Sequence, residues 1–105
     1  SLAAMLAAGG AQAQSLNVVC SNEQAWCDLM AQNFEIDTGI DVAMVRKSTG
    51  EVLAQIRAEA GNPKVDVWWG GTGDPHLIAA NEGLTVATGV DVSGQLGWSQ
   101  NMAEM

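Results

Sequence analysis

The sequence is poor in several residue types that particular functions require. It contains no tyrosine, one phenylalanine, one histidine and four basic residues against twelve acidic ones, so its net charge is −8. Such an acidic excess argues against nucleic acid or an anionic membrane surface as a partner. The apolar run at the front of the chain is too short to span a bilayer. With 105 residues, 48% of them hydrophobic, the chain can form one small domain or a piece of a larger one.

Motifs of catalysis and of nucleotide binding are also missing. The glycines at 70–73 are not followed by the lysine of a P-loop, and they lack the G-x-G-x-x-G spacing of a dinucleotide site. No serine lies in a G-x-S-x-G elbow. His76, beside Asp74, could act as a ligand or a base, although a lone histidine in the first turn of a helix is more often a surface residue. A small secreted hydrolase using Asp74 and His76 is therefore kept as an alternative, while no catalytic residue, cofactor or metal site is predicted.

Residues 1–13 have the pattern of a secretory signal peptide. A stretch of small and apolar residues leads into Ala11-Gln12-Ala13, an A-x-A site that predicts cleavage after Ala13 and a mature start at Gln14. A flexible alanine- and glycine-rich tail is the alternative. Because an initiator methionine and a basic leading region are missing, we expect the front of the sequence to be clipped, and the fold is argued from residue 14 onward.

The two cysteines are Cys20 and Cys27. Export implies an oxidising compartment, so we predict a disulfide between the end of the first strand and the start of the following helix. A metal site built on the two cysteines is the alternative, but His76 is far away in the sequence.

From residue 15 the chain alternates short strands with helices. Strands are predicted at 16–20, 40–45 and 65–69. The first helix is expected to be capped by Ser21 or Asn22 and to end at Gly39. The second begins with the capping box Ser48-Thr49-Gly50-Glu51 and closes at Gly61, and the third runs over 75–82 behind an N-cap at Asp74. This alternation predicts an α/β fold with a mainly parallel sheet.

Two further expectations concern packing and the end of the chain. Trp26, Met30 and Phe34 recur at helical spacing, which favours a buried face of the first helix. After Leu84 the pattern weakens, and residues 98–105 could begin another helix. Three strands leave an open sheet edge, so the sequence is interpreted as the front portion of a larger protein.

Two loops carry the ligand-binding prediction. Residues 46–51 and 70–74 each follow a predicted strand and open a helix, so in a parallel sheet both lie at the same carboxyl edge. Helix N-termini present unpaired N–H groups and a positive dipole end, which favours an anion. Capping and turning alone would also explain the serine and the glycines in these loops, but two such loops at one edge favour a ligand site.

Several runs of the sequence together resemble bacterial periplasmic solute-binding proteins of ABC importers, in the branch that binds ferric iron or 2-aminoethylphosphonate. The resemblance covers residues 15–86 well and 87–105 more loosely. It is carried by the runs Leu16-Asn17-Val18-Val19-Cys20, Glu23-Gln24-Ala25-Trp26-Cys27, Thr38-Gly39-Ile40, residues 48–60, Asn62-Pro63-Lys64 and residues 66–77.

The resemblance implies a type II periplasmic-binding-protein fold with two hinged lobes that close on a solute. It assigns residues 1–13 to a signal-peptide remnant, 14–86 to part of the N-terminal lobe and 87–105 to a truncated continuation. It also implies a periplasmic, monomeric, non-enzymatic protein that delivers an anionic or metal–anion solute to an inner-membrane permease. Ferric binders of this type use tyrosines of the second lobe, and this sequence has none, so we do not expect these 105 residues to bind iron by themselves even if the parent protein does. An oxyanion such as phosphate, phosphonate or carbonate fits the helix-terminus loops better. The residues assigned to the ligand by position are Ser21, Ser48, Thr49, Gly50, Gly71 and Thr72. A fragment with no ligand affinity of its own is the remaining alternative.

Overall fold

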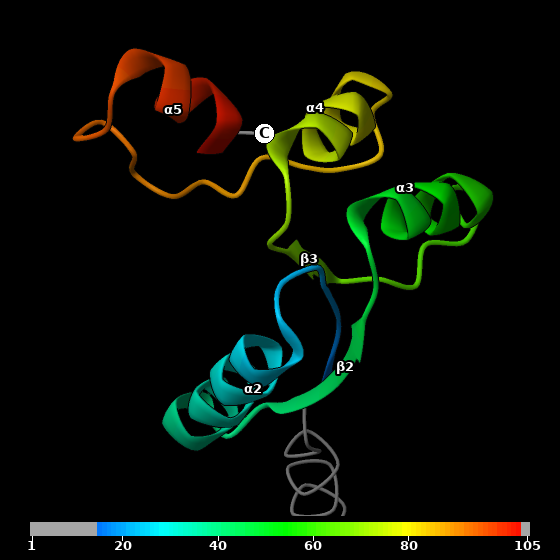
Figure 1. Ribbon diagram of the computed structural model, residues 1–105, viewed down its shortest axis with the longest axis vertical. Coiled ribbons are helices and arrows are strands. Elements are labelled where there is room, and N and C mark those ends of the chain that lie inside the picture. The colour runs from blue at the N-terminus through cyan, green and yellow to red at the C-terminus, as the bar shows by residue number, and fades with distance from the viewer. Residues whose placement is uncertain (1–14, 104–105) are drawn as a thin grey trace, which may run out of the picture.

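A computed structural model describes residues 15–103, which form a three-stranded parallel sheet and four helices (Figure 1). The α/β fold with a parallel sheet is the one that the sequence predicts. In chain order the elements are β1 (Ser15–Cys20), α2 (Gln24–Thr38), β2 (Asp41–Arg46), α3 (Thr49–Ala58), β3 (Val67–Trp69), α4 (Gly73–Asn81) and α5 (Gly97–Ala103).

The first strand lies in the middle of the sheet, whose order is β2-β1-β3. Along β2 the register pairs Ser15 with Asp41 and Cys20 with Arg46, whereas β3 pairs only with the second half of β1. Because all three strands run in the same direction, the segments that follow them leave the sheet at one edge. That edge is where α2, α3 and α4 begin.

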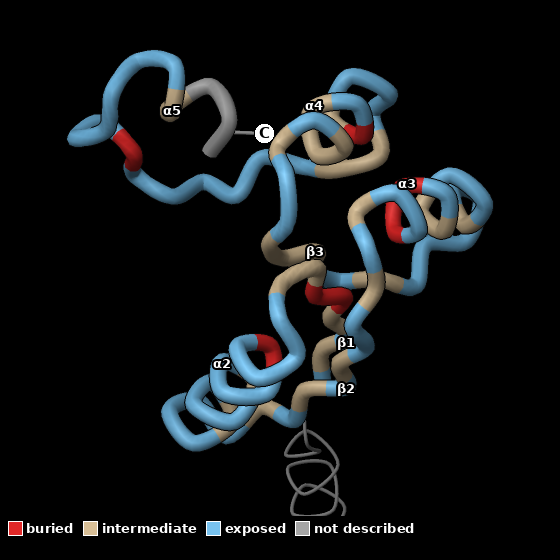
Figure 2. The backbone as a smooth tube through the Cα atoms, in the orientation of Figure 1, coloured by how far each residue is buried: buried red, intermediate tan, exposed pale blue. Residues whose placement is uncertain are grey.

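The buried residues are few and lie on β1, on α2, α3 and α4, and in the segment between α4 and α5 (Figure 2). The buried hydrophobic residues are Val19, Cys20, Cys27, Val52, Leu53, Ala79 and Val92. The predicted disulfide between Cys20 and Cys27 is confirmed, with the two Cα atoms 6.0 Å apart and both residues fully buried. It ties α2 to the central strand.

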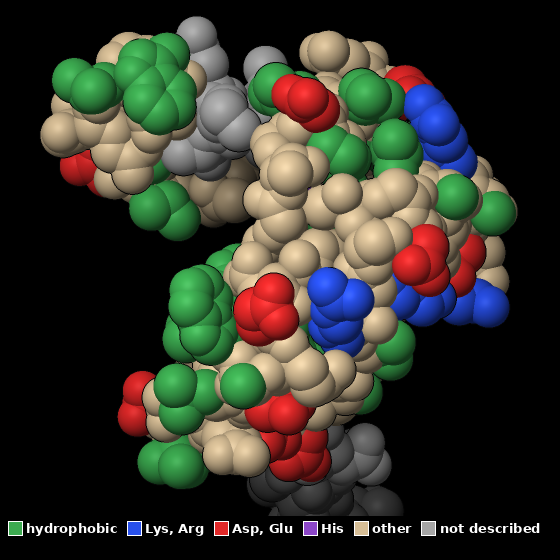
Figure 3. Space-filling model, viewed as in Figure 1, with side chains coloured by type: hydrophobic (Ala, Val, Ile, Leu, Met, Phe, Trp, Pro, Cys, Tyr) green, Lys and Arg blue, Asp and Glu red, His purple; other side chains and the backbone are tan. Residues whose placement is uncertain are grey.

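The prediction that Trp26, Met30 and Phe34 form a buried face of the first helix is wrong, because all three side chains are exposed, most of all that of Trp26. This side chain is 64% exposed, and Met30 is 50% exposed. Met30 and Phe34 line an apolar groove of about 170 Å³ between α2 and the sheet, and no other element of residues 15–103 covers them. Hydrophobic side chains therefore reach the surface over α2 (Figure 3). None of the helices in that range combines the length and the apolar character needed to cross a membrane.

Two helix boundaries follow the predicted signals. Ser48 is the N-cap of α3: its Oγ accepts a hydrogen bond from the Glu51 amide at 3.3 Å and donates to the Glu51 carboxylate at 2.8 Å. Gly39 ends α2 in the left-handed conformation with φ = 72°, which glycine adopts without steric cost. Both signals are local, so the sequence predicts them reliably.

Other boundaries differ from the prediction. The N-cap of α2 is Glu23 rather than Ser21 or Asn22, and the N-cap of α4 is Thr72 rather than Asp74. The third helix therefore begins at Gly73, and α3 ends at Ala58, before Gly61. Strand β3 covers 67–69 rather than 65–69. It starts late because the Asn17 amide donates to the Asp66 side-chain carboxylate, at 2.8 Å, instead of to a backbone carbonyl of the third strand.

An ion pair joins α3 to the end of α4. The Arg57 guanidinium donates through Nε to Glu82 Oε1 at 2.9 Å and through Nη2 to the other oxygen. The bonded guanidinium holds the pKa of the Glu82 carboxyl below its usual range and raises the pKa of Arg57. Both side chains are about half exposed, so solvent screens the pair and its effect on stability is small.

We expect this ion pair to give a small acid-dependent loss of stability. A carboxyl whose pKa is depressed in the folded state stabilises the fold above its unfolded pKa, and that contribution is lost as the pH falls through the folded value. Wild type should therefore exceed Glu82→Gln in stability at pH 7, and the gap should close below the ordinary pKa of glutamate. Urea unfolding of both proteins between pH 7 and pH 3 measures this gap, and a gap that widens on acidification would contradict the assignment.

Candidate functional site

Three loops converge at the carboxyl edge of the sheet, and Gly71 is the point where they touch. A methyl group built on Gly71 would lie 2.2 Å from Thr49 Cγ2 and 2.9 Å from Ser21 Cβ. Ser21 follows β1, Thr49 follows β2 and Gly71 follows β3. Gly71 also has φ = 85°, which L side chains rarely adopt. The sequence predicted two loops at this edge, and the structure brings all three into contact.

Asn22 links these loops through hydrogen bonds, and the sequence analysis missed it as a site residue. Its Oδ1 accepts from the Gly71 amide at 3.2 Å, and its backbone carbonyl accepts from Arg46 Nε at 2.9 Å. A methyl group on Gly70 would lie 2.3 Å from Asn22 Nδ2, so the amide packs directly on that glycine. The available signal was the position of Asn22, two residues beyond a strand of a parallel sheet.

His76 and Trp68 hold the loop after β3 in place. Their rings stack with centroids 3.8 Å apart, and His76 Nε2 lies 2.8 Å from the Gly70 carbonyl, to which it donates because a carbonyl can only accept. With one nitrogen holding the loop and one face covered by an indole, this histidine has a structural role. No observation on the described residues favours a hydrolase built on His76 and Asp74.

The hydroxyl groups of the predicted site residues differ in what they can still bind. Trp68 Nε1 donates to Ser21 Oγ at 3.1 Å, and because an indole only donates, the proton of Ser21 remains free for another acceptor. Ser48 donates its proton to Glu51. Thr49 is half-buried and Thr72 is exposed, and within residues 15–103 neither hydroxyl makes a hydrogen bond.

The electrostatics of the edge come from two helix starts and a few side chains. Gly50 lies in the first turn of α3, and α4 begins at Gly73, so both helices direct the positive ends of their dipoles toward this region. Glu51 and Asp74, in the same first turns, oppose that field. Arg46 is the cation that contacts the loops, since Arg57 pairs with Glu82 and Lys47 Nζ donates to Gln55 at 2.7 Å.

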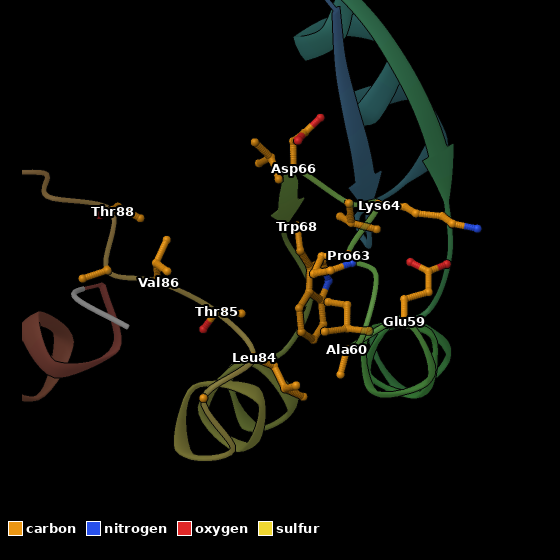
Figure 4. Close-up of a pocket in the computed structure, with 15 residues that line it drawn as sticks. Glu59, Ala60, Pro63, Lys64, Asp66, Trp68, Leu84, Thr85, Val86 and Thr88 are labelled. Atoms are coloured by element: carbon orange, nitrogen blue, oxygen red, sulfur yellow. The ribbon is translucent and has the colours of Figure 1, made fainter.

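A cavity of about 630 Å³ lies away from these loops (Figure 4). It is bounded by β3, the end of α3 and the segment after α4, and Trp68 forms part of its wall. Its other labelled residues are Glu59, Ala60, Pro63, Lys64, Asp66, Leu84, Thr85, Val86 and Thr88. None of the six predicted ligand residues lines it. Over residues 15–103, no three His, Cys, Asp or Glu side chains gather closely enough to hold a metal ion.

The chain was compared with known protein families, curated proteins and solved structures. No model of a known protein family matches the chain. An uncharacterized protein of Haemophilus influenzae is 37% identical over 87 residues, which is 77% of this chain and 25% of that protein. The chain thus spans about a quarter of the length of this curated relative.

Solved structures, two of them of periplasmic binding proteins, resemble the chain over a similar share. AfuA from Actinobacillus pleuropneumoniae, with exogenous fructose-6-phosphate bound, is 35% identical with a TM-score of 0.66, over 69% of this chain and 23% of AfuA. The periplasmic binding protein P5PA is 31% identical with a TM-score of 0.68, over 70% of this chain and 24% of P5PA. Iron-bound HitA from Pseudomonas aeruginosa is 22% identical with a TM-score of 0.67, over 75% of this chain and 25% of HitA. At this identity the comparison shows a similar fold and nothing more.

AfuA and P5PA are periplasmic binding proteins, in agreement with the expectation of a non-enzymatic protein. Each is covered over about a quarter of its length. Within that quarter, the parallel sheet and its crossover helices have the arrangement predicted from the sequence. The chain is therefore similar to periplasmic binding proteins and has the α/β fold of part of such a protein.

Proposed function

We propose that this chain is part of the substrate-binding component of an ABC importer, which captures an anionic or metal–anion solute in the periplasm. The observation that carries the proposal is the contact of Gly71 with Ser21 and Thr49, because it joins three loops into one surface at the carboxyl edge of the sheet. Ligands of open α/β sheets bind at this edge. The likeness to periplasmic binding proteins supports the proposal independently of the contact.

The donors at this edge favour an oxyanion. The free proton of Ser21 and the amides of the first two residues of α3 and of α4 are neutral donors of the kind that hold phosphate or phosphonate oxygens. A phosphate ester is supported further by AfuA, a structure with fructose-6-phosphate bound and 35% identity to this chain. Ferric iron is the less favoured solute for this surface, because its donors are N–H and O–H groups that suit an oxyanion.

In this proposal the six predicted ligand residues form one wall of the site. The facing wall and the contact with an inner-membrane permease belong to the parts of a binding protein that this chain does not match. Residues 14–86 would then be part of the first lobe, 87–105 its continuation and 1–13 a secretion signal. The signal peptide falls outside the described residues. The protein would act as a monomer, without a cofactor.

We expect the protein expressed from the complete gene to be stabilised by one class of solute. Thermal unfolding would be followed with inorganic phosphate, 2-aminoethylphosphonate, fructose 6-phosphate and ferric citrate, with sodium chloride at equal ionic strength as the control. A solute present at about 100 times its Kd should stabilise the fold by about 2.7 kcal/mol, a shift of several degrees in Tm.

Failure of every solute to shift Tm would overturn the anion proposal. Release of phosphate from fructose 6-phosphate in the same samples tests the hydrolase alternative. We expect the buffer rate, and a faster release that is lost in both Asp74→Asn and His76→Ala would favour the hydrolase instead.

A further inference from the structure

We propose that Asn22 contacts the solute directly, donating a side-chain N–H to one of its oxygens while the other end of the same amide holds Gly71. This inference rests on the proposed function, since it adds a residue to the same surface. Asn22 was not among the six residues predicted from the sequence. It is argued from three contacts on different sides of this residue.

The first contact fixes which end of the amide is free. The Gly71 backbone N–H can only donate, so the atom 3.2 Å away must be the accepting oxygen, Oδ1. The two N–H groups of Nδ2 then point away from that bond. No partner for Nδ2 is present among residues 15–103, and Asn22 is partly exposed. A donor is therefore available at the centre of the three loops.

The other two contacts hold this donor in place. Arg46 Nε donates to the Asn22 carbonyl at 2.9 Å, which fixes the backbone of the loop after β1. On the opposite side the amide packs on Gly70, where a methyl group would come within 2.3 Å of Nδ2 and 2.6 Å of Oδ1. Only a glycine leaves room for the side chain here. A donor that is already ordered loses little conformational entropy when it binds, which favours affinity.

The charge of the surroundings makes a neutral donor at this position useful. Glu51 and Asp74 lie in the first turns of α3 and α4, and an incoming anion is repelled by both. An amide adds attraction without needing a counter-ion of its own. A carboxylate in its place would keep the acceptor for Gly71 but would turn an oxygen toward the anion and repel it.

The substitution Asn22→Asp separates these two roles of the side chain. Its oxygen can still accept from Gly71, so the fold should be retained, while the solute loses its donor and meets a negative charge. Loss of one charge-assisted hydrogen bond corresponds to roughly a 10- to 100-fold weaker Kd. Isothermal titration with inorganic phosphate and with fructose 6-phosphate, on the protein from the complete gene, measures this change. Asn33→Asp is the matched control, because it adds the same charge on an exposed position of α2; its Kd should stay within twofold of wild type.

The outcomes distinguish this inference from the proposed function. Wild-type protein that binds neither phosphate nor fructose 6-phosphate would overturn this inference, whereas the proposed function fails only if none of the four solutes shifts Tm. Wild-type protein that binds, together with an Asn22→Asp variant that binds equally tightly, would overturn the role of Asn22 alone. If Asn22→Asp lowers Tm by more than a few degrees, the neutral and smaller Asn22→Ala decides: a tenfold weaker Kd is expected, and an unchanged Kd would overturn the inference. The affinity gap between wild type and Asn22→Asp should narrow at acidic pH as the introduced carboxylate is neutralised, because Glu51, Asp74 and the phosphate probe are common to both proteins. A gap that does not change with pH would contradict the direct contact.

Discussion

Gly71→Ala is expected to lower the free energy of unfolding by about 2–4 kcal/mol and to weaken solute binding at least tenfold. Two costs combine at this position. The residue has φ = 85°, which strains any L side chain, and the new methyl would overlap Thr49 Cγ2 and Ser21 Cβ. Thr49 can respond by turning its side chain, but Ser21 Cβ is fixed to the backbone and can move only if the loop after β1 moves. The convergence of the three loops is thereby lost.

Gly39→Ala is the control that separates strain from crowding. Gly39 has a similar φ of 72°, but a methyl group there meets nothing within 4 Å. We expect it to cost about 1 kcal/mol, the strain alone, and to leave solute affinity unchanged. Urea unfolding gives both free energies, and titration with inorganic phosphate gives the affinities. Equal losses of stability in the two variants would show that Gly71 does not touch the other loops.

Removal of the disulfide is expected to cost a similar amount of stability. In the chain-entropy model, opening a loop as short as the one between Cys20 and Cys27 lowers the free energy of unfolding by about 2–3 kcal/mol. Both cysteines are fully buried, and Cys20 is paired with Arg46 on one side and Trp69 on the other. The bridge therefore fixes the start of α2 to β1, the strand with which both β2 and β3 pair.

The double variant Cys20→Ala/Cys27→Ala tests this expectation. Urea unfolding of oxidised wild type, of wild type in dithiothreitol and of the double variant should show the first as the most stable. Adding dithiothreitol to the double variant should change nothing, which controls for effects of the reductant. Coincident midpoints for oxidised and reduced wild type would mean that the bridge contributes no stability.

The parts of the fold that the sequence predicts are those set by local chemistry. The capping box at Ser48 and the stop at Gly39 each depend on residues within one turn, and the pairing of Cys20 with Cys27 spans a short loop. The strand–helix alternation also follows from local patterns. These predictions are confirmed because no distant contact competes with them.

The parts that the sequence misses depend on distant contacts. Ser21 and Asn22 are good capping residues, yet neither caps α2, because one accepts from Trp68 and the other from Gly71. Those partners lie almost fifty residues away in the chain, and no local pattern reveals them. The predicted ligand role of Ser21 remains a prediction. That Ser21 does not cap α2 is nevertheless a consequence of its position among the three loops.

The apolar stripe of α2 is a second case of this kind. Helical spacing marks Trp26 as a residue that would be buried if a second layer covered α2. Periodicity identifies the face but cannot say whether its cover lies within the same stretch of chain. Among residues 15–103 no such cover exists, so Trp26 is exposed.

The central position of β1 sets the order in which the binding surface can form during synthesis. β1 leaves the ribosome first, but its hydrogen bonds require Asp41–Arg46 and then Val67–Trp69, so each ladder must wait for a long loop to close. Helix α2 needs only neighbouring residues, and its bridge to Cys20 joins positions with a sequence separation of 7, so neither depends on the strands that follow. The glycines after β3 emerge last of the three loops. The contact of Gly71 with Ser21 and Thr49 can therefore form only after β3 has been made and has paired with β1.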